Sequence, residues 1–167
     1  PVGISDRDMK KLLVWTKGGG TLISEGCFGY FNDCGHAIET MQPNRGFEDV
    51  FGCIQTSVHL GPDANKNITI DSMHGKINAG VYRQVFQVTQ GKAEGYYSNG
   101  EIAIVSSNCG KGKAMLVGSM PGYGYQHHAN EVSRRWFSSL LRFAGMQPAA
   151  FAPYNQEVTI RLWENCD

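Results

Sequence analysis

The chain has 167 residues, enough for one domain with a substantial core. Its 15 basic and 15 acidic side chains cancel, so no net field would draw it to nucleic acid or to an acidic membrane surface. No apolar run approaches the ~20 residues that a membrane span requires. We therefore expect a soluble domain, either cytoplasmic or secreted, that binds neither nucleic acid nor membrane.

The first predicted element is a helix that begins after Ser5, whose hydroxyl can cap the free backbone amides. Helical spacing then forms one apolar stripe of Met9, Leu12 and Leu13. The glycines at 18–20 end this helix. The short apolar run 21–24 is typical of a strand buried on both faces of a parallel sheet. Helix, glycine turn and buried strand together favour a flavodoxin-like α/β sheet with flanking helices.

The stretch 25–46 has the composition of a loop, with a short helix predicted at 37–41. Residues 46–51 are predicted to form one more helical turn. Residues 53–60 alternate between apolar and polar types, which predicts a strand.

After about Asn67 the pattern has a period of two, which predicts further strands. Asn99-Gly100 and the glycine-rich run 110–112 are turn signals, so residues 97–118 are predicted to form an antiparallel β-meander. A last helix is predicted at 130–144, with an inward stripe of Val132, Trp136, Leu140 and Phe143.

Prolines at 148 and 153 indicate a linker, and residues 158–162 alternate as a final strand. We expect an α/β domain at 1–147, followed at 148–167 by a linker and the first strand of another β domain. Because an open α/β sheet normally begins with a strand and this chain begins with a helix, we also expect the first strands to be missing.

One candidate for chemistry follows the predicted strand 21–24. A nucleophile on a glycine-flanked strand-to-loop turn is how α/β hydrolases expose a reactive atom, and Cys27 has glycines on both sides. His127 or His128 would have to act as its base. The alternative is that Cys27 is a small buried apolar side chain, or that it forms a disulfide with Cys34. Glu25 ends the same strand, but no second acid is placed to form a glycosidase pair with it.

The other candidate is the segment 123–128, predicted as a loop after a parallel strand. Loops at the carboxyl edge of such sheets bind ligands. The possible ligand or interface residues are therefore Glu25, Cys27, Phe28, Tyr123, Tyr125, His127 and His128. Adjacent histidines rarely point at one ion, and the five cysteines lack zinc spacing, so no metal or cofactor is expected.

The run from Lys10 to Ile23, with its Gly-Gly-Thr-Leu turn, resembles the class I glutamine amidotransferase-like fold. Residues 99–118, with a Gly-Lys-Gly turn, followed by a helix ending in Phe143-Ala144-Gly145, resemble the trimerisation domain of family 42 β-galactosidases. The resemblance covers roughly residues 5 to 163 and implies a non-catalytic oligomerisation domain that helps to shape the sugar cleft of a larger glycoside hydrolase. It also implies a homo-oligomer, contacts with other domains of the same polypeptide, and a carbohydrate nearby.

Two other functions remain open at this stage. The first is a hydrolase or amidotransferase-type enzyme with Cys27 as the nucleophile. In the resembled amidotransferases the cysteine sits in a tight elbow, whereas here it lies about one residue late after the strand. The second is a stand-alone sugar-binding module that uses Tyr96, Tyr97, Tyr123 and Tyr125.

Overall fold

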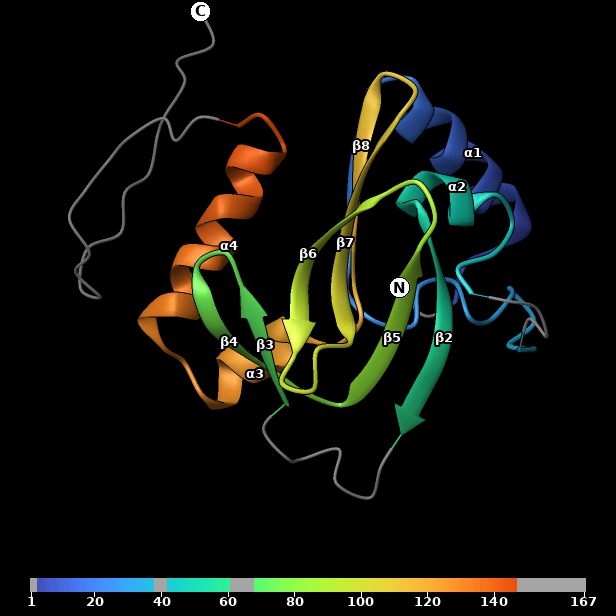
Figure 1. The fold of residues 1–167 in the computed structure, drawn as a ribbon. Coiled ribbons are helices and arrows are strands. Elements are labelled where there is room, and N and C mark those ends of the chain that lie inside the picture. Colours follow the sequence, from blue (N-terminus) through green and yellow to red (C-terminus); the bar gives the residue numbers. More distant parts are fainter. Residues whose placement is uncertain (1–2, 38–41, 61–67, 147–167) are drawn as a thin grey trace, which may run out of the picture.

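The computed structural model describes residues 3–37, 42–60 and 68–146 of the chain (Figure 1). The linker and strand predicted beyond residue 147, and most of the helix predicted at 37–41, lie outside these ranges. In chain order the elements are α1 (Asp6–Lys17), β1 (Thr21–Ser24), α2 (Phe47–Phe51), β2 (Cys53–Leu60), β3 (Ile68–Ser72), β4 (Gly75–Ala79), β5 (Tyr82–Val88), β6 (Lys92–Tyr97), β7 (Ile102–Cys109), β8 (Gly112–Val117), α3 (Pro121–His127) and α4 (Glu131–Phe143).

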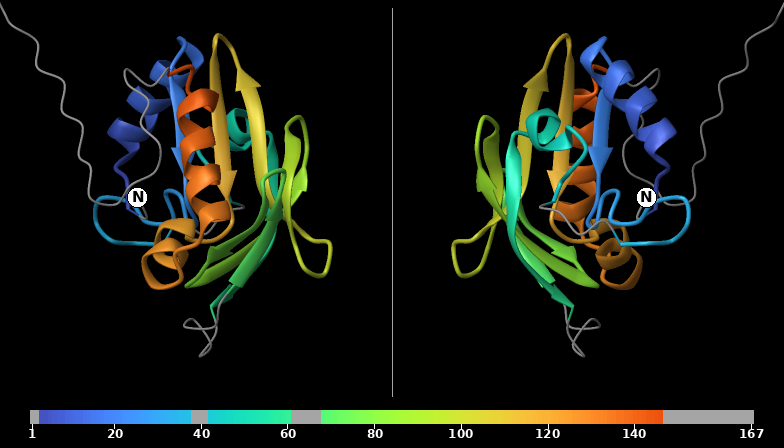
Figure 2. Two further views of the ribbon diagram at one scale, coloured as in Figure 1. Left: turned by 90° about the vertical axis from the view of Figure 1, so that its left-hand side faces the viewer. Right: turned by 90° about the vertical axis from the view of Figure 1, so that its right-hand side faces the viewer.

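The domain is a mixed α/β fold built on one curled sheet of eight strands, in the order β1-β8-β7-β6-β3-β4 (Figure 2). Strand β5 leaves this path, because it pairs with both β7 and β2. Only β1 and β8 are parallel; the other pairs are antiparallel. The prediction that β1 is buried on both faces was wrong: β1 lies at the edge of the sheet, and only Ser24 of its four residues is buried.

Helix α1 covers one face of the sheet. The Ser5 hydroxyl accepts a hydrogen bond from the Asp8 N–H at 3.1 Å, which caps the helix as predicted. The α1 stripe, together with α2, packs on a core cluster that includes Phe86, Val105 and Leu116 from the sheet.

Helix α4 covers the opposite face. The Asn130 side chain caps it by accepting from Ser133 N–H at 2.7 Å. Trp136 is 4% exposed and packs in a second cluster with Ile104 and Val117 of the sheet. The stripes predicted for α1 and α4 therefore both pack on one sheet, on its two faces, and Figure 1 shows the two helices on either side of β7 and β8.

The predicted meander is also confirmed, because β6, β7 and β8 pair antiparallel in sequence order. Its first turn closes with a hydrogen bond from Tyr97 N–H to the Glu101 carbonyl at 2.8 Å. Gly112 is required at the second turn, since a Cβ there would lie 1.9 Å from the Thr16 carbonyl oxygen. This close approach places the β7–β8 turn against the end of α1.

The segment 121–127 is the helix α3, so its prediction as a loop was wrong. Pro121 suits the first turn of a helix, where its missing N–H has no intrahelical partner. Gly124 permits close packing: a Cβ there would lie 2.4 Å from the Asn78 carbonyl oxygen on β4. The glycine at position 124 of this helix is thus explained by the contact between α3 and β4.

Cys27 and Cys34 are both free thiols, so the disulfide considered between them is not formed. Within the described ranges, no helix is both long and apolar enough to span a membrane. The same residues contain no group of three side chains suited to hold a metal ion.

Candidate functional site

The candidate site lies at the carboxyl edge of the parallel strands β1 and β8, whose following segments meet. Loop 25–37 follows β1, and a short connection leads from β8 into α3. The Gly26 N–H donates to the Ser119 carbonyl at 3.1 Å. The Gly122 N–H donates to the Glu25 carboxylate at 2.6 Å, which joins the loop to the start of α3.

Glu25 therefore has a structural partner. Its carboxylate lies at the first turn of α3, where free backbone amides and the helix dipole favour negative charge. A Cβ on Gly122 would lie 3.1 Å from the same carboxylate oxygen, so the glycine allows this approach. The geometry supports a role for Glu25 in holding α3 to the end of β1.

Cys27 sits on a left-handed turn directly beyond β1, with φ of 63°. This backbone conformation is costly for a non-glycine residue, and such strain is found at nucleophile elbows. However, the side chain is only 2% exposed. The Cys27 N–H donates to the side-chain oxygen of Gln84 at 2.6 Å.

A buried polar network surrounds this turn. The Gln84 side-chain amide donates to the Tyr30 hydroxyl at 2.8 Å and to the Gln55 side-chain oxygen at 2.5 Å. Tyr30 also donates to Gln55. Gln84 is 2% exposed, so these hydrogen bonds offset the cost of burying its carboxamide.

The electrostatics at Cys27 oppose nucleophilic chemistry. Burial raises the pKa of the thiol to about 11, and a hydrogen bond with Tyr30 lowers it by less than burial raises it. A catalytic cysteine needs the reverse, a pKa depressed by a neighbouring imidazolium or helix N-terminus. The group that contacts the thiol is a phenol whose own pKa is raised to about 12, mainly by burial.

Helix α3 divides its aromatic side chains between two directions. Tyr123 packs on Gly80, and its ring centroid lies 4.3 Å from that of the exposed His127. Tyr125 turns instead toward α4, with its ring 5.6 Å from Phe137. His128 follows the helix, and its carbonyl accepts from the Asn78 side chain at 2.6 Å.

The carboxyl edge thus brings together only some of the predicted residues. Glu25, Tyr123, His127 and His128 reach the surface of this edge or its border. Phe28 lies in the core, 2% exposed, with its ring 4.9 Å from Phe47. The tyrosines proposed for sugar stacking are also separated: Tyr96 is 44% exposed, whereas Tyr97 is buried and donates to the carbonyls of Gln84 and Gly118.

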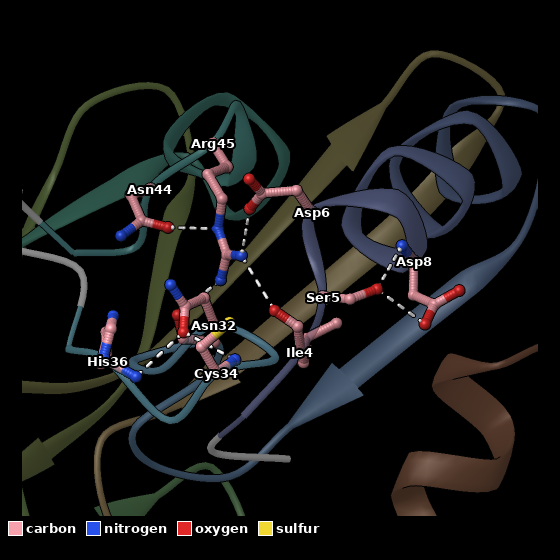
Figure 3. A network of polar contacts seen from close by, with 10 residues as sticks. Ile4, Ser5, Asp6, Asp8, Asn32, Cys34, His36, Asn44 and Arg45 are labelled. Carbon is pink, nitrogen blue, oxygen red and sulfur yellow. Dashed lines mark hydrogen bonds and ion pairs between the residues drawn. The ribbon is translucent and has the colours of Figure 1, made fainter.

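Arg45 is an organising residue that the sequence patterns did not single out (Figure 3). Its guanidinium donates to the Ile4 carbonyl at 3.0 Å and to the Gly29 carbonyl at 2.6 Å, and it pairs with Asp6 at 2.9 Å. These contacts join the start of α1, the loop after β1 and the segment before α2. In the same loop the Asn32 side chain accepts from the backbone N–H groups of residues 34 and 36, as Figure 3 shows.

Several solved structures with a similar fold are β-galactosidases. Gan42B, a GH42 β-galactosidase from G. stearothermophilus, matches with a TM-score of 0.72 and 18% identity over 90% of this chain and 21% of its own. The Bacillus circulans sp. alkalophilus β-galactosidase matches with a TM-score of 0.73 and 15% identity, over 91% and 23%. The cold-adapted Rahnella sp. R3 β-galactosidase matches with a TM-score of 0.75 and 18% identity, over 95% and 24%.

The chain thus spans about a fifth to a quarter of the length of these enzymes. No curated protein sequence matches it. Residues 2–143 match the family model described as the β-galactosidase trimerisation domain. This match takes in all twelve helices and strands of the described structure. The chain belongs to the β-galactosidase trimerisation domain family.

Proposed function

We propose that the chain is the trimer-forming part of a larger GH42-type β-galactosidase, in which three copies assemble. The observation that carries this proposal is the family match over residues 2–143. The coverage of the related enzymes supports it, because the chain corresponds to a minor part of each of them. The catalytic carboxylates would then lie elsewhere in the parent polypeptide, and the substrate would be a β-galactoside.

We propose that this assembly uses an exposed apolar surface beside β1, which we name the edge patch: Val14, Trp15, Leu141 and Met146. The four side chains are 72%, 52%, 49% and 58% exposed. Trp15 and Met146 line one shallow hollow together with the glycine turn 18–20. Grouped apolar side chains of this exposure are typical of surfaces that contact another protein.

The edge patch also adjoins an open strand. Among the described residues, β1 pairs with β8 alone, so one of its sides presents unpaired backbone groups. An open edge flanked by apolar side chains favours association, and proteins normally cover or block such edges. We propose that a second copy of the chain provides this cover.

Substitutions test the edge patch separately from the trimer. Trp15→Glu and Met146→Glu should weaken self-association at least about tenfold, because each places a charge in a contact that excludes water. Met73→Glu is the matched control, since Met73 is 81% exposed but lies on the β3–β4 turn. If wild type is trimeric and both edge variants stay trimeric, the edge patch is not the contact. If folded wild type is monomeric, the trimer itself is refuted.

We further propose that the domain descends from the class I amidotransferase-like fold and that Cys27 is a remnant of its elbow. Support comes from the φ of 63° at Cys27, directly beyond the parallel strand β1. The raised pKa of the thiol favours a structural role over catalysis. The exposed His127 and His128, with Tyr123, are then proposed to face the sugar cleft or a neighbouring domain rather than to activate the thiol.

That role has its own test. A double variant, His127→Ala with His128→Ala, should change the KM for a β-galactoside in the parent enzyme while the mass of the assembly stays constant. An unchanged KM would contradict the proposal that the carboxyl edge borders the sugar cleft.

A further inference from the structure

The face of the sheet under α4 changes from apolar to polar along β7. Side chains alternate between the two faces of a strand, so Ile104, Ser106 and Asn108 share the face that α4 covers. Ile104 is 1% exposed, Ser106 is 9% exposed and Asn108 is exposed. Helix α4 packs over the apolar end of this row, and its last residue, Phe143, lies where the polar end begins.

A polar hollow of about 300 Å³ occupies this position. It lies at the C-terminal end of α4, where β6 begins and β7 ends (Figure 1). Its lining includes the side chains of Gln90, Lys92, Glu94, Ser106, Asn108 and Phe143. A narrower apolar hollow of about 150 Å³ continues from it under α4 and shares Glu94 and Phe143. Ligand sites in proteins start at volumes of about 300 Å³.

Several hydrogen-bonding groups in this hollow have no protein partner among the described residues. One Glu94 oxygen accepts from the Ser106 hydroxyl at 2.9 Å and pairs with Lys92 at 3.0 Å. The other Glu94 oxygen has no partner within the described part of the chain. Across residues 3–37, 42–60 and 68–146, the carboxamides of Gln90 and Asn108 likewise make no side-chain hydrogen bond. These groups therefore offer both donors and acceptors to a ligand.

The charges restrict the class of ligand. Lys92 and Glu94 are paired with each other, so their charges cancel. The other charge at the rim is Lys113, the cross-strand neighbour of Asn108, whose ammonium group lies 5.9 Å from the centroid of the Phe143 ring and donates to the Phe143 carbonyl. What remains is two carboxamides, one carboxylate oxygen and a serine hydroxyl beside an aromatic ring. Planar amide and carboxylate groups can hydrogen-bond neighbouring hydroxyls, while the ring can contact an apolar C–H face.

We propose that this hollow binds a neutral saccharide, with Gln90, Glu94 and Asn108 on its hydroxyls and Phe143 against its ring face. The site lies at the C-terminal end of α4, whereas α3 and the carboxyl edge lie near its first turn, and it goes beyond the proposed trimer function. Since the parent enzyme would act on galactosides, the hollow would give it a second, non-catalytic place to hold sugar.

The test is titration of the ¹⁵N-labelled 167-residue chain with lactose, cellobiose and maltose, followed by amide chemical shifts. At least one sugar should shift the amides of 90–94 and 106–108 with an affinity in the range of about 1–10 mM. Asn108→Ala and Gln90→Ala should each weaken this binding at least about fivefold, because each removes a hydrogen-bonding partner. Inorganic phosphate at equal concentration should shift none of these amides.

Gln126→Ala is the matched control, since Gln126 is an exposed residue of α3, which lies near the first turn of α4, whereas the hollow lies at the last (Figure 1). It should leave the affinity unchanged. The proposal is overturned if no sugar shifts these amides at about 100 mM, at least tenfold above the expected dissociation constant. It is also overturned if the shifts lie elsewhere, or if the Asn108 and Gln90 variants, with unchanged thermal unfolding, bind as wild type does.

Discussion

Replacing Trp136 by alanine should destabilise the domain by about 3–5 kcal/mol, the range for large aromatic side chains removed from a core. Trp136 is 4% exposed and anchors α4 to the sheet. An indole of this kind buries about 150–250 Å² of surface, which at about 25 cal/mol per Å² corresponds to about 4–6 kcal/mol as an upper value. Its ring also lies 5.0 Å from that of Phe137, edge to face, and that contact would be lost.

The surroundings of Trp136 explain why the expected loss of stability is slightly smaller than that upper value. Trp136 borders the 150 Å³ apolar hollow under α4, so part of its surface already lacks close neighbours. In the opposite direction, alanine would enlarge this hollow and the paired strands beneath it limit how far the site can collapse, which keeps the loss above about 3 kcal/mol.

Urea unfolding followed by far-UV circular dichroism measures this change. Tyr96→Ala is the matched control, because Tyr96 is 44% exposed and its replacement should lower the free energy of unfolding by less than half as much. A loss below about 1 kcal/mol for Trp136→Ala would refute the reasoning that this residue seats α4 on the sheet. Equal losses for the two variants would do so as well.

Three further predictions concern the loop after β1 and its neighbours. At pH 8, Cys27 should be alkylated far more slowly than the exposed Cys34. Rapid labelling of Cys27 at pH 6 that is lost in His127→Ala would instead support the hypothesis of a cysteine-dependent enzyme. The free energy of unfolding should fall as pH rises from 9 toward 11, because the Cys27 thiol has a pKa near 9.0 in the unfolded chain but about 11 in the folded protein. In urea melts, Cys27→Ala should lose less stability over this pH range. Arg45→Ala should lower the free energy of unfolding by about 2–3 kcal/mol and speed amide exchange in loop 29–37. The control Lys11→Ala, which breaks an exposed ion pair, should lower it by less than about 0.5 kcal/mol. Equal losses in the two variants would contradict the role given to Arg45.

Elements with strong local patterns were predictable from the sequence. The α1 stripe, the capped α4 helix and the meander turning at Asn99-Gly100 follow from periodicity and turn chemistry, which act over a few residues. Helix α3 was not predictable in the same way. Its two glycines are explained by contacts with residues distant in sequence: Gly124 lies against Asn78 of β4, and Gly122 lies against the Glu25 carboxylate.

The position of β1 shows a second limit. The apolar run 21–24 indicated a strand, but its place at the edge depends on which strands pair with it. Nothing in a four-residue run encodes that pairing.

The sequence indicated where the candidate site lies better than it indicated what each of its residues does. Strand-to-loop positions singled out Glu25 and Cys27, and both lie in the loop that follows β1. Their partners come from distant parts of the chain: Gln84 for Cys27, and the backbone of Gly122 for Glu25. The partners of Arg45 are also distant in sequence, since its carbonyl acceptors lie 41 and 16 residues away.

The native mass of the assembly tests the central claim most directly. Sedimentation equilibrium or light scattering on the natural polypeptide that contains this chain, at micromolar concentration, should give three times the mass of one polypeptide. Correctly folded protein that stays at the mass of a single polypeptide over the whole concentration range would contradict the account.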